Sequence, residues 1–479
     1  MGYINMKKFN KDKYLKKLRF KKYKRYLYIG IACILVLLIG IYFAYSKFSV
    51  SKDTEVVRTT VGDFISGDVV VGAYIDGKYS SIIPGKNDGY IVDKIVCDTD
   101  ASASWNNDSW GIIVTNLTKR TKCNVYFETK KPPLTEAITT AMNSNPSMFA
   151  VNDPGKNGRY IGANPNNYVY FNCSDYNNQS DSTCEKWRII GVFNDVTKSD
   201  GTKENLVKII RDDPLGKYYW DSKATGSATT SSGTNDWTDS QLMMMLNPTN
   251  YLKSGYKISG DIVLDKDNFE IYSKMGSYYN GTKGCEPADT TASESFSCTE
   301  VDFTSNGLKN DITRNAIEEV VWNLGGSSTY DDVTPSMFYE RERGTTVYGD
   351  HATIWNGKIG LMYPSDYGYA TSGGTTKDRA ACLAKELYKW GSSDFSDCSE
   401  NDYLYYPNLS TLTPTATPTA IDNDNLVFGT GFSYDKFIAP YRTDNVMAVR
   451  PALFLKSNIV VKSGTGESSN PYQLKLGID

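Results

Sequence analysis

The chain has 479 residues, which is enough for two or three domains at roughly 150 residues each. Its formal net charge is only −3, but residues 1–27 hold eleven Lys and Arg against the single acid Asp12. The remainder has 41 basic and 54 acidic residues, a net charge of −13. Because nucleic-acid-binding domains present basic surfaces, this acidic remainder argues against a nucleic-acid partner.

Residues 27–46 are expected to form a transmembrane signal anchor whose partner is membrane lipid. The nineteen residues from Leu27 to Tyr45 carry no charge and, at about 1.5 Å each, nearly span a ~30 Å hydrocarbon core. The basic segment 1–26 should stay in the cytoplasm, which places the following domains outside the cell. The alternative is a cleaved signal peptide, since Ala44-Tyr45-Ser46 loosely fits a cleavage site, although the apolar stretch is unusually long for one.

The nine cysteines indicate an oxidising compartment. Cys33 falls within the expected anchor, and the other eight occur as four pairs of neighbours, a spacing that suits four local disulfides without fixing their connectivity. A zinc site is not expected, because CxxC-like spacing is absent and the chain has one histidine. The expected pairs are Cys97/Cys123, Cys173/Cys184, Cys285/Cys298 and Cys382/Cys398.

Residues 47–131 predict a small module resembling a β-sandwich. The stretch VVVGAYIDGKYSSIIP alternates around Asp76-Gly77, a strong signal for a two-residue hairpin turn. Trp105 and Trp110 flank a polar loop and are expected to pack in the module rather than to form a sugar platform. Prolines then mark a linker, 132–151, in which LTEAITTAMNSN predicts a short helix.

Residues 152–479 predict a large mixed α/β domain, so the expected fold class of the whole chain is α+β. The run Met243–Met245 is expected to fill the core from a helix rather than to bind a metal. The Thr/Pro/Ala segment 411–420 is expected to be an exposed loop or an extended spacer. Predicted strands cover 168–171, 187–193, 206–210 and 446–461, and predicted helices cover 242–248, 308–326 and 377–390.

The stretch KIGLMYPSDYGYATSGG, residues 358–374, has the composition of a functional site. We expect Ile359–Met362 to form a buried strand in which Gly360 allows a neighbour to approach closely. Tyr363–Asp366 should turn the chain out of the sheet, with Asp366 bonded to nearby backbone N–H groups rather than acting as a catalytic acid. A helix cap is then expected at Thr375 or Thr376.

Four blocks of the larger domain follow one another in the chain: Trp187–Val192, the Trp237…Leu242…Leu246-Asn247 helix, Gly360–Tyr369 and Val449–Leu453. Together they resemble an uncharacterised bacterial domain family of the formylglycine-generating-enzyme and C-type-lectin-like superfamily. The resemblance covers roughly residues 152–479 and implies a twisted sheet with helices and long surface loops. It implies no common reaction.

No catalytic residue is assigned from the sequence. Oxidases of the formylglycine-generating type depend on reactive cysteines near the C-terminus, whereas Cys382 and Cys398 have disulfide-like spacing. A multi-histidine iron site is excluded by the single histidine, His351, which we expect in a loop or at a strand edge. No metal ligand is assigned either; calcium could bind clustered oxygens at 422–425 or 330–332, but both segments more often form solvated turns.

The sequence therefore favours non-enzymatic recognition of an extracellular glycan, peptide or envelope protein by a membrane-anchored cell-surface protein. The 35 tyrosines suit a binding surface, although a base composition that favours Tyr and Asn codons explains them equally well. The expected ligand-binding residues are Tyr434, Phe437 and Tyr441. Two alternatives stay open: an enzyme of the formylglycine-generating type, and a structural component of the envelope.

Overall fold

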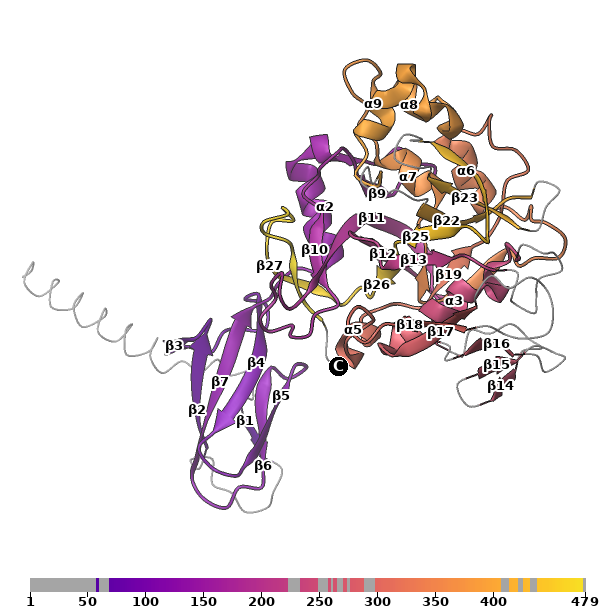
Figure 1. The fold of residues 1–479 in the computed structure, drawn as a ribbon. Coiled ribbons are helices and arrows are strands. Elements are labelled where there is room, and N and C mark those ends of the chain that lie inside the picture. Colours follow the sequence, from indigo (N-terminus) through magenta and orange to yellow (C-terminus); the bar gives the residue numbers. More distant parts are fainter. Residues whose placement is uncertain are drawn as a thin grey trace, which may run out of the picture. The chain divides into compact units, whose positions relative to one another are not determined.

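The computed structural model divides the chain into two compact units, Met1–Lys130 and Lys131–Asp479 (Figure 1). The mixture of helix and strand confirms the predicted α+β class. The expected basic segment 1–26 and signal anchor 27–46 lie outside the described residues, and no helix among the described residues is long and apolar enough to cross a membrane. The structure describes residues 57–59, 69–222, 233–248, 257–259, 262–264, 270–273, 276–287, 298–405, 413–420, 425–430 and 437–476.

The smaller unit contains two sheets. One sheet has the order β1-β6-β5, and the other has the order β3-β2-β7-β4, in which β2 and β7 run parallel. The apolar side chains of β6 and β7, including Ile112, Val114 and Phe127, form its core. The strands are β1 (Val57–Thr59), β2 (Val69–Ile75), β3 (Lys78–Ser80), β4 (Tyr90–Cys97), β5 (Ser102–Asn106), β6 (Gly111–Thr115) and β7 (Thr121–Thr129).

Two local predictions for this unit are confirmed. Asp76 and Gly77 both have positive φ, at 46° and 78°, as a type I′ hairpin turn between β2 and β3 requires. Trp105 and Trp110 meet edge to face with ring centroids 5.3 Å apart, and the indole N–H of Trp110 donates to the Pro84 carbonyl at 2.7 Å. The two indoles therefore pack within the unit.

The larger unit is built on a seven-stranded sheet with the order β21-β26-β12-β11-β9-β8, in which β10 also pairs with β11. The predicted meander is present, because β11 pairs antiparallel with both β10 and β12. The strand β26, which falls within the predicted strand region 446–461, lies between β12 and β21 in this sheet. The strands are β8 (Phe149–Ala150), β9 (Gly158–Tyr160), β10 (Tyr168–Phe171), β11 (Glu185–Thr197), β12 (Lys203–Arg211), β21 (Ile359–Gly360) and β26 (Ala452–Leu455).

Two helices pack their apolar side chains into the core of this unit. The helix α2 (Leu134–Ser144) buries Leu134 and Ile138, so it belongs to the larger unit rather than to a spacer ahead of it. The helix α3 (Gln241–Leu246) buries all six of its side chains, which confirms the core role predicted for Met243–Met245. The hydroxyl of Ser240 caps α3 by accepting from the Met243 N–H.

The prediction of a helix over residues 308–326 is wrong for the second half of that range. Only α5 (Asp311–Asn315) is helical, and β19 (Val320–Asn323) pairs with β20 (Ile354–Gly357). Val320 and Trp322 are buried while their neighbours are half-buried, which is the period-2 pattern of a strand. The helix predicted over 377–390 also divides into α8 (Arg379–Leu383), capped by Asp378 rather than by Thr375 or Thr376, and a 3-10 turn at Leu387–Gly391.

The segment predicted to be an exposed loop at 411–420 is instead a buried strand. Every residue of β22 (Thr413–Pro418) is buried, and it pairs with β23 (Leu426–Thr430), which pairs with β24 (Ile438–Arg442). The hydroxyl of Thr415 donates to the Phe428 carbonyl at 2.8 Å, and the Ala416 N–H donates to the Met362 carbonyl at 3.0 Å. Thr415 tolerates burial here because the structure supplies such a partner for its hydroxyl.

The other elements of the larger unit surround this framework. The helices are α4 (Ser277–Asn280), α6 (Pro335–Glu342), α7 (Pro364–Ala370) and α9 (Ser396–Glu400). The strands are β13 (Gly216–Tyr219), β14 (Lys257–Ser259), β15 (Ile262–Leu264), β16 (Glu270–Ser273), β17 (Lys283–Pro287), β18 (Cys298–Asp302), β25 (Val446–Val449), β27 (Val460–Ser463) and β28 (Gln473–Lys475).

Candidate functional site

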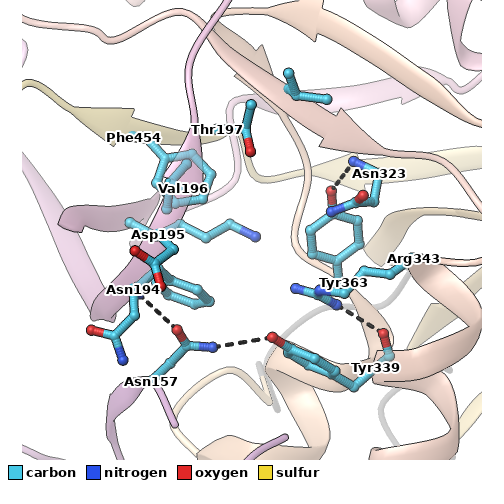
Figure 2. A pocket seen from close by; sticks show the side chains of 13 residues that line it. Asn157, Asn194, Asp195, Val196, Thr197, Asn323, Tyr339, Arg343, Tyr363 and Phe454 are labelled. Atoms are coloured by element: carbon cyan, nitrogen blue, oxygen red, sulfur yellow. Dashed lines mark hydrogen bonds between the residues drawn. The ribbon is translucent and has the colours of Figure 1, made fainter. Parts of the chain in front are cut away.

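A cavity of about 200 Å³ opens in the larger unit between the β11–β12 hairpin and the segments around α6 and β19 (Figure 2). Asn194 and Asp195 lie on one wall, and Tyr339 and Arg343 lie on the opposite wall. Its volume suits a ligand the size of one sugar or one amino-acid residue rather than a drug-sized molecule. We therefore take this cavity as the candidate functional site.

An irregularity in β11 shapes the first wall. The register between β11 and β12 shifts between Phe193 and Val196, and Asp195 in the shift has a φ of 50°. The Asn194 N–H, freed from the regular ladder, donates to the amide oxygen of Asn157 at 2.8 Å. Such bulges re-aim side chains beside binding sites, and this one presents Asn194 and Asp195 at the cavity.

Lys208 of β12 lies at the base of the cavity within a chain of buried charges. Its ammonium is 2.6 Å from one carboxylate oxygen of Asp366, and the other oxygen of Asp366 accepts from Arg159 at 2.7 Å. Arg159 also donates to Asp153 at 2.6 Å. All four side chains are almost completely buried, so the two cations and two carboxylates compensate one another away from solvent.

Asp366 stays ionised in this environment. Burial alone would raise its pKa, but the Lys208 and Arg159 cations outweigh that effect and hold the pKa of Asp366 well below its ordinary value. Burial lowers the pKa of Lys208, with Asp366 opposing that shift. Asp366 also accepts the Tyr363 N–H at 2.9 Å, which confirms the predicted bond to nearby backbone. The segment does not form a simple turn, however, because α7 begins at Pro364.

Aromatic rings surround the Lys208 ammonium. It lies 4.3 Å from the ring centroid of Tyr363, 5.1 Å from that of Trp322 and 5.6 Å from that of Phe454. These distances are within the range of cation–π attraction, which is stronger where water is excluded. The rings and Asp366 together hold the cation in one place at the cavity wall.

Arg343 follows the C-terminal end of α6 and is the more accessible cation of the cavity. Its guanidinium lies over the Tyr339 ring at 3.4 Å from the centroid, and its side chain is 28% exposed. One terminal nitrogen, Nη1, donates to the Tyr339 carbonyl at 2.9 Å (Figure 2) and also to Glu342 at 3.2 Å. The guanidinium is thus fixed from one side.

Glu342 beneath Arg343 is fully buried. Burial raises its pKa to about 7, although Arg343 and the hydrogen bonds from Ser365 favour the charged form. The Ser365 hydroxyl donates to this carboxylate at 2.5 Å, and the Ser365 N–H donates at 2.9 Å. The charge beside Arg343 therefore changes near neutral pH.

Tyr363 completes the cavity between the two cations. Its hydroxyl accepts the Asn323 N–H at 2.9 Å, and burial raises its pKa above the ordinary value. The phenol therefore stays neutral and acts as a rigid wall. Asn323 places a side-chain amide at the same wall.

The ligand-binding residues predicted from the sequence do not line this cavity. Tyr434 lies outside the described residues. Phe437 packs on Tyr388 with ring centroids 5.1 Å apart, and Tyr441 of β24 is half-buried against the core. Neither aromatic side chain is among those lining the cavity, so the structure brings none of the three to it.

The structure also locates His351, most of the candidate metal ligands and three of the predicted disulfides. His351 lies in the loop ahead of β20, with its ring 5.8 Å from that of Tyr348. Among the described residues no group of three or more His, Cys, Asp or Glu could hold a metal ion, and residues 422–424 are outside that range. The disulfides Cys97–Cys123, Cys173–Cys184 and Cys382–Cys398 are present, which confirms three predicted pairs; the side chains of Cys285 and Cys298 are not described.

Comparisons of the chain with family models, with curated proteins and with solved structures find no match. The site is therefore interpreted from its own geometry.

Proposed function

We propose that this chain is a membrane-anchored cell-surface protein whose larger unit recognises an extracellular ligand without chemical reaction. Residues 27–46 would hold it in the membrane, and the cavity between β11 and α6 would receive the terminal unit of a glycan or peptide. The similarity of residues 152–479 to the formylglycine-generating-enzyme and C-type-lectin-like superfamily is part of the same proposal.

The observation that carries the proposal is the preorganised cavity itself. Lys208 is held by Asp366 and three aromatic rings, and Arg343 is fixed on the Tyr339 ring. Binding sites of this kind combine apolar walls with a few polar groups in fixed positions, because groups that are already ordered lose little entropy on binding. The cavity has both features.

The state of the C-terminal cysteines favours binding over the oxidase alternative. Oxidases of the formylglycine-generating type need a thiolate near the C-terminus, and a disulfide does not supply one. Cys382 and Cys398 are joined and fully buried in the structure. The structural-envelope alternative has no comparable observation in its favour.

The experiment is a combined glycan and peptide array probed with the full chain in detergent, with and without calcium. We expect a defined set of ligands to bind, and we expect Thr197→Trp, which places an indole at the cavity wall, to remove most of that signal. The matched control is Thr139→Trp, at an exposed position of α2 outside the cavity. A blank array, or equal binding by Thr197→Trp, would contradict the proposal.

A further inference from the structure

We infer that the cavity binds a carboxylate group, with Arg343 as its principal partner. This inference rests on the proposed function, because it names the ligand class of the same site. The carboxylate could belong to an acidic sugar of a glycan or to the carboxyl terminus of a peptide, and the two sources share the chemistry that the cavity would recognise.

The hydrogen bonds of the Arg343 guanidinium orient it for a carboxylate ligand. Both of its hydrogen bonds to protein use Nη1, and the ring of Tyr339 supports its face. Among the described residues no acceptor engages Nε or Nη2 of Arg343. These two nitrogens form the edge that pairs with a carboxylate through two parallel hydrogen bonds. The protein therefore anchors one side of the guanidinium and leaves its carboxylate-binding edge available.

The second argument is the direction in which this edge faces. In Figure 2 the Arg343 side chain runs over Tyr339 toward the middle of the cavity, between Tyr339 and Tyr363. The side chain is 28% exposed, whereas that of Lys208 is fully buried, so Arg343 is the cation that a ligand in the cavity can contact. A surface arginine would extend into solvent, where it loses less conformational entropy.

The third argument is the distribution of charge around the cavity. Asp366 lies between two cations, and the four-residue chain of Asp153, Arg159, Asp366 and Lys208 has no net charge. Glu342 is the only acid paired with Arg343 among the described residues, and its pKa of about 7 leaves it partly protonated at neutral pH. A bound carboxylate would supply the missing countercharge.

Lys208 provides a second positive centre at the base of the same cavity. An ammonium has three N–H donors, and one of them is directed to Asp366 at 2.6 Å. Within the described part of the chain, no other oxygen accepts a hydrogen bond from this ammonium. Because this ammonium is fully buried, it attracts a bound carboxylate through its charge rather than through direct contact.

One acidic residue opposes the inference. Asp195 lies on the opposite wall, and its negative charge would repel an anion. Asp195 is exposed, however, so water and salt screen its charge, whereas Lys208 is fully buried. Asp195 is also an acceptor for hydroxyl or amide N–H groups at the far end of the ligand. The two walls therefore suit a carboxylate that also carries hydrogen-bond donors.

The test is isothermal titration calorimetry with the full chain in detergent. The probes form two pairs: D-glucuronate with D-glucose for a sugar source, and N-acetylglycine with N-acetylglycinamide for a peptide source. We expect at least one carboxylate to bind at least tenfold more tightly than its neutral analogue. The pair that shows the difference identifies the source of the carboxylate.

The variants separate the role of Arg343 from general effects of charge. Arg343→Lys keeps the positive charge but lacks the planar fork, and we expect it to weaken carboxylate binding at least tenfold. Lys203→Gln removes an exposed lysine from the strand that carries Lys208, and we expect no change. Thermal unfolding of each variant checks that the chain remains folded.

The outcomes distinguish this inference from the proposed function. Equal binding of carboxylate and neutral probes, absence of binding by both carboxylates, or wild-type affinity of Arg343→Lys would each overturn the carboxylate inference. The proposed function would still stand if array ligands bind and Thr197→Trp removes their binding. It would fall if Thr197→Trp leaves every ligand bound, whatever the ligand's charge.

Discussion

The ammonium of Lys208 and the carboxylate of Asp366 lie 2.6 Å apart, although 158 residues separate them in the chain. Their contact joins the central strand β12 to the first turn of α7, where Asp366 also accepts the Tyr363 N–H. Lys208 of this pair also lines the base of the cavity. Stability of the larger unit and the shape of its binding site therefore depend on one ion pair.

Replacement of Asp366 by Asn should strongly destabilise the larger unit. The change leaves the fully buried Lys208 without its carboxylate and deprives Arg159 of one of its two partners. Breaking a buried ion pair by removing one partner typically costs about 3–5 kcal/mol, because the remaining charge stays desolvated. We expect a loss of that size in the free energy of unfolding, measured by urea titration.

The control for this variant is Asp311→Asn. Asp311 also pairs with an arginine, Arg314, at 2.8 Å, but its side chain is 87% exposed. Exposed pairs contribute about 0–1 kcal/mol, so this variant should unfold almost like the wild type. Equal losses from the two substitutions would show that burial of the Lys208–Asp366 pair has no special energetic effect.

Glu342 should make the larger unit less stable as the pH rises through neutrality. Its pKa is about 7 in the folded protein and near 4.5 in the unfolded chain, so between these values the folded state binds more protons. Stability linked to this group is therefore present below about pH 4.5 and is lost as the pH rises toward 7. This shift in the pKa of Glu342 corresponds to roughly 3 kcal/mol in the free energy of unfolding.

The measurement compares urea unfolding of the wild type and Glu342→Gln between pH 5 and pH 8. Other groups titrate equally in both proteins, so the difference between the two curves isolates Glu342. We expect the wild type to lose stability relative to Glu342→Gln as the pH rises. Parallel curves would mean that the Glu342 carboxyl does not titrate in this range.

Thr415→Val tests the unexpected burial of β22. The substitution keeps the shape of the side chain but removes the hydroxyl that donates to the Phe428 carbonyl at 2.8 Å. A buried acceptor left without a partner costs about 1–3 kcal/mol, and we expect that loss in the free energy of unfolding. Thr139→Val is the control, because the Thr139 hydroxyl donates to a carbonyl at an exposed position of α2.

Thiol labelling without reductant should leave the six cysteines of the three described disulfides unmodified, even in urea. Mass spectrometry of labelled peptides would check Cys382 and Cys398 in particular, because these two are the ones that the oxidase alternative needs as thiols. Labelling of either residue in the purified chain would favour that alternative. After reduction, both should label.

The features that the sequence predicted correctly are local ones. The Asp76-Gly77 turn depends on two adjacent residues, and the disulfide Cys173–Cys184 joins a strand pair only a few residues apart. Burial of Met243–Met245 follows from an apolar run after a cap. In each case the interactions that decide the structure lie within a short window of the chain.

The features that the sequence missed depend on distant partners. Nothing within the Thr/Pro/Ala segment reveals that β23 and Met362 will pair with its backbone and that Phe428 will accept from the Thr415 hydroxyl. Lys208, Arg343 and Asp366 likewise come from three separate parts of the chain. The one available signal was an acidic residue, Asp366, four residues after the predicted strand Ile359–Met362, and its partners could not be identified without the fold.

Because β11 is bulged, the cavity has two regions that differ in how well they tolerate amino-acid substitution. Lys208 at the base, with its partner Asp366, cannot change without a large loss of stability, whereas Asn194 and Asp195 are exposed and extend from an interrupted ladder. Substitutions at these two positions can therefore alter which ligand is accepted at a smaller cost in stability. That cost comes from the hydrogen bond of the Asn194 amide to the Lys156 carbonyl at 2.7 Å and from the positive φ of Asp195, which favours Asn, Asp or Gly.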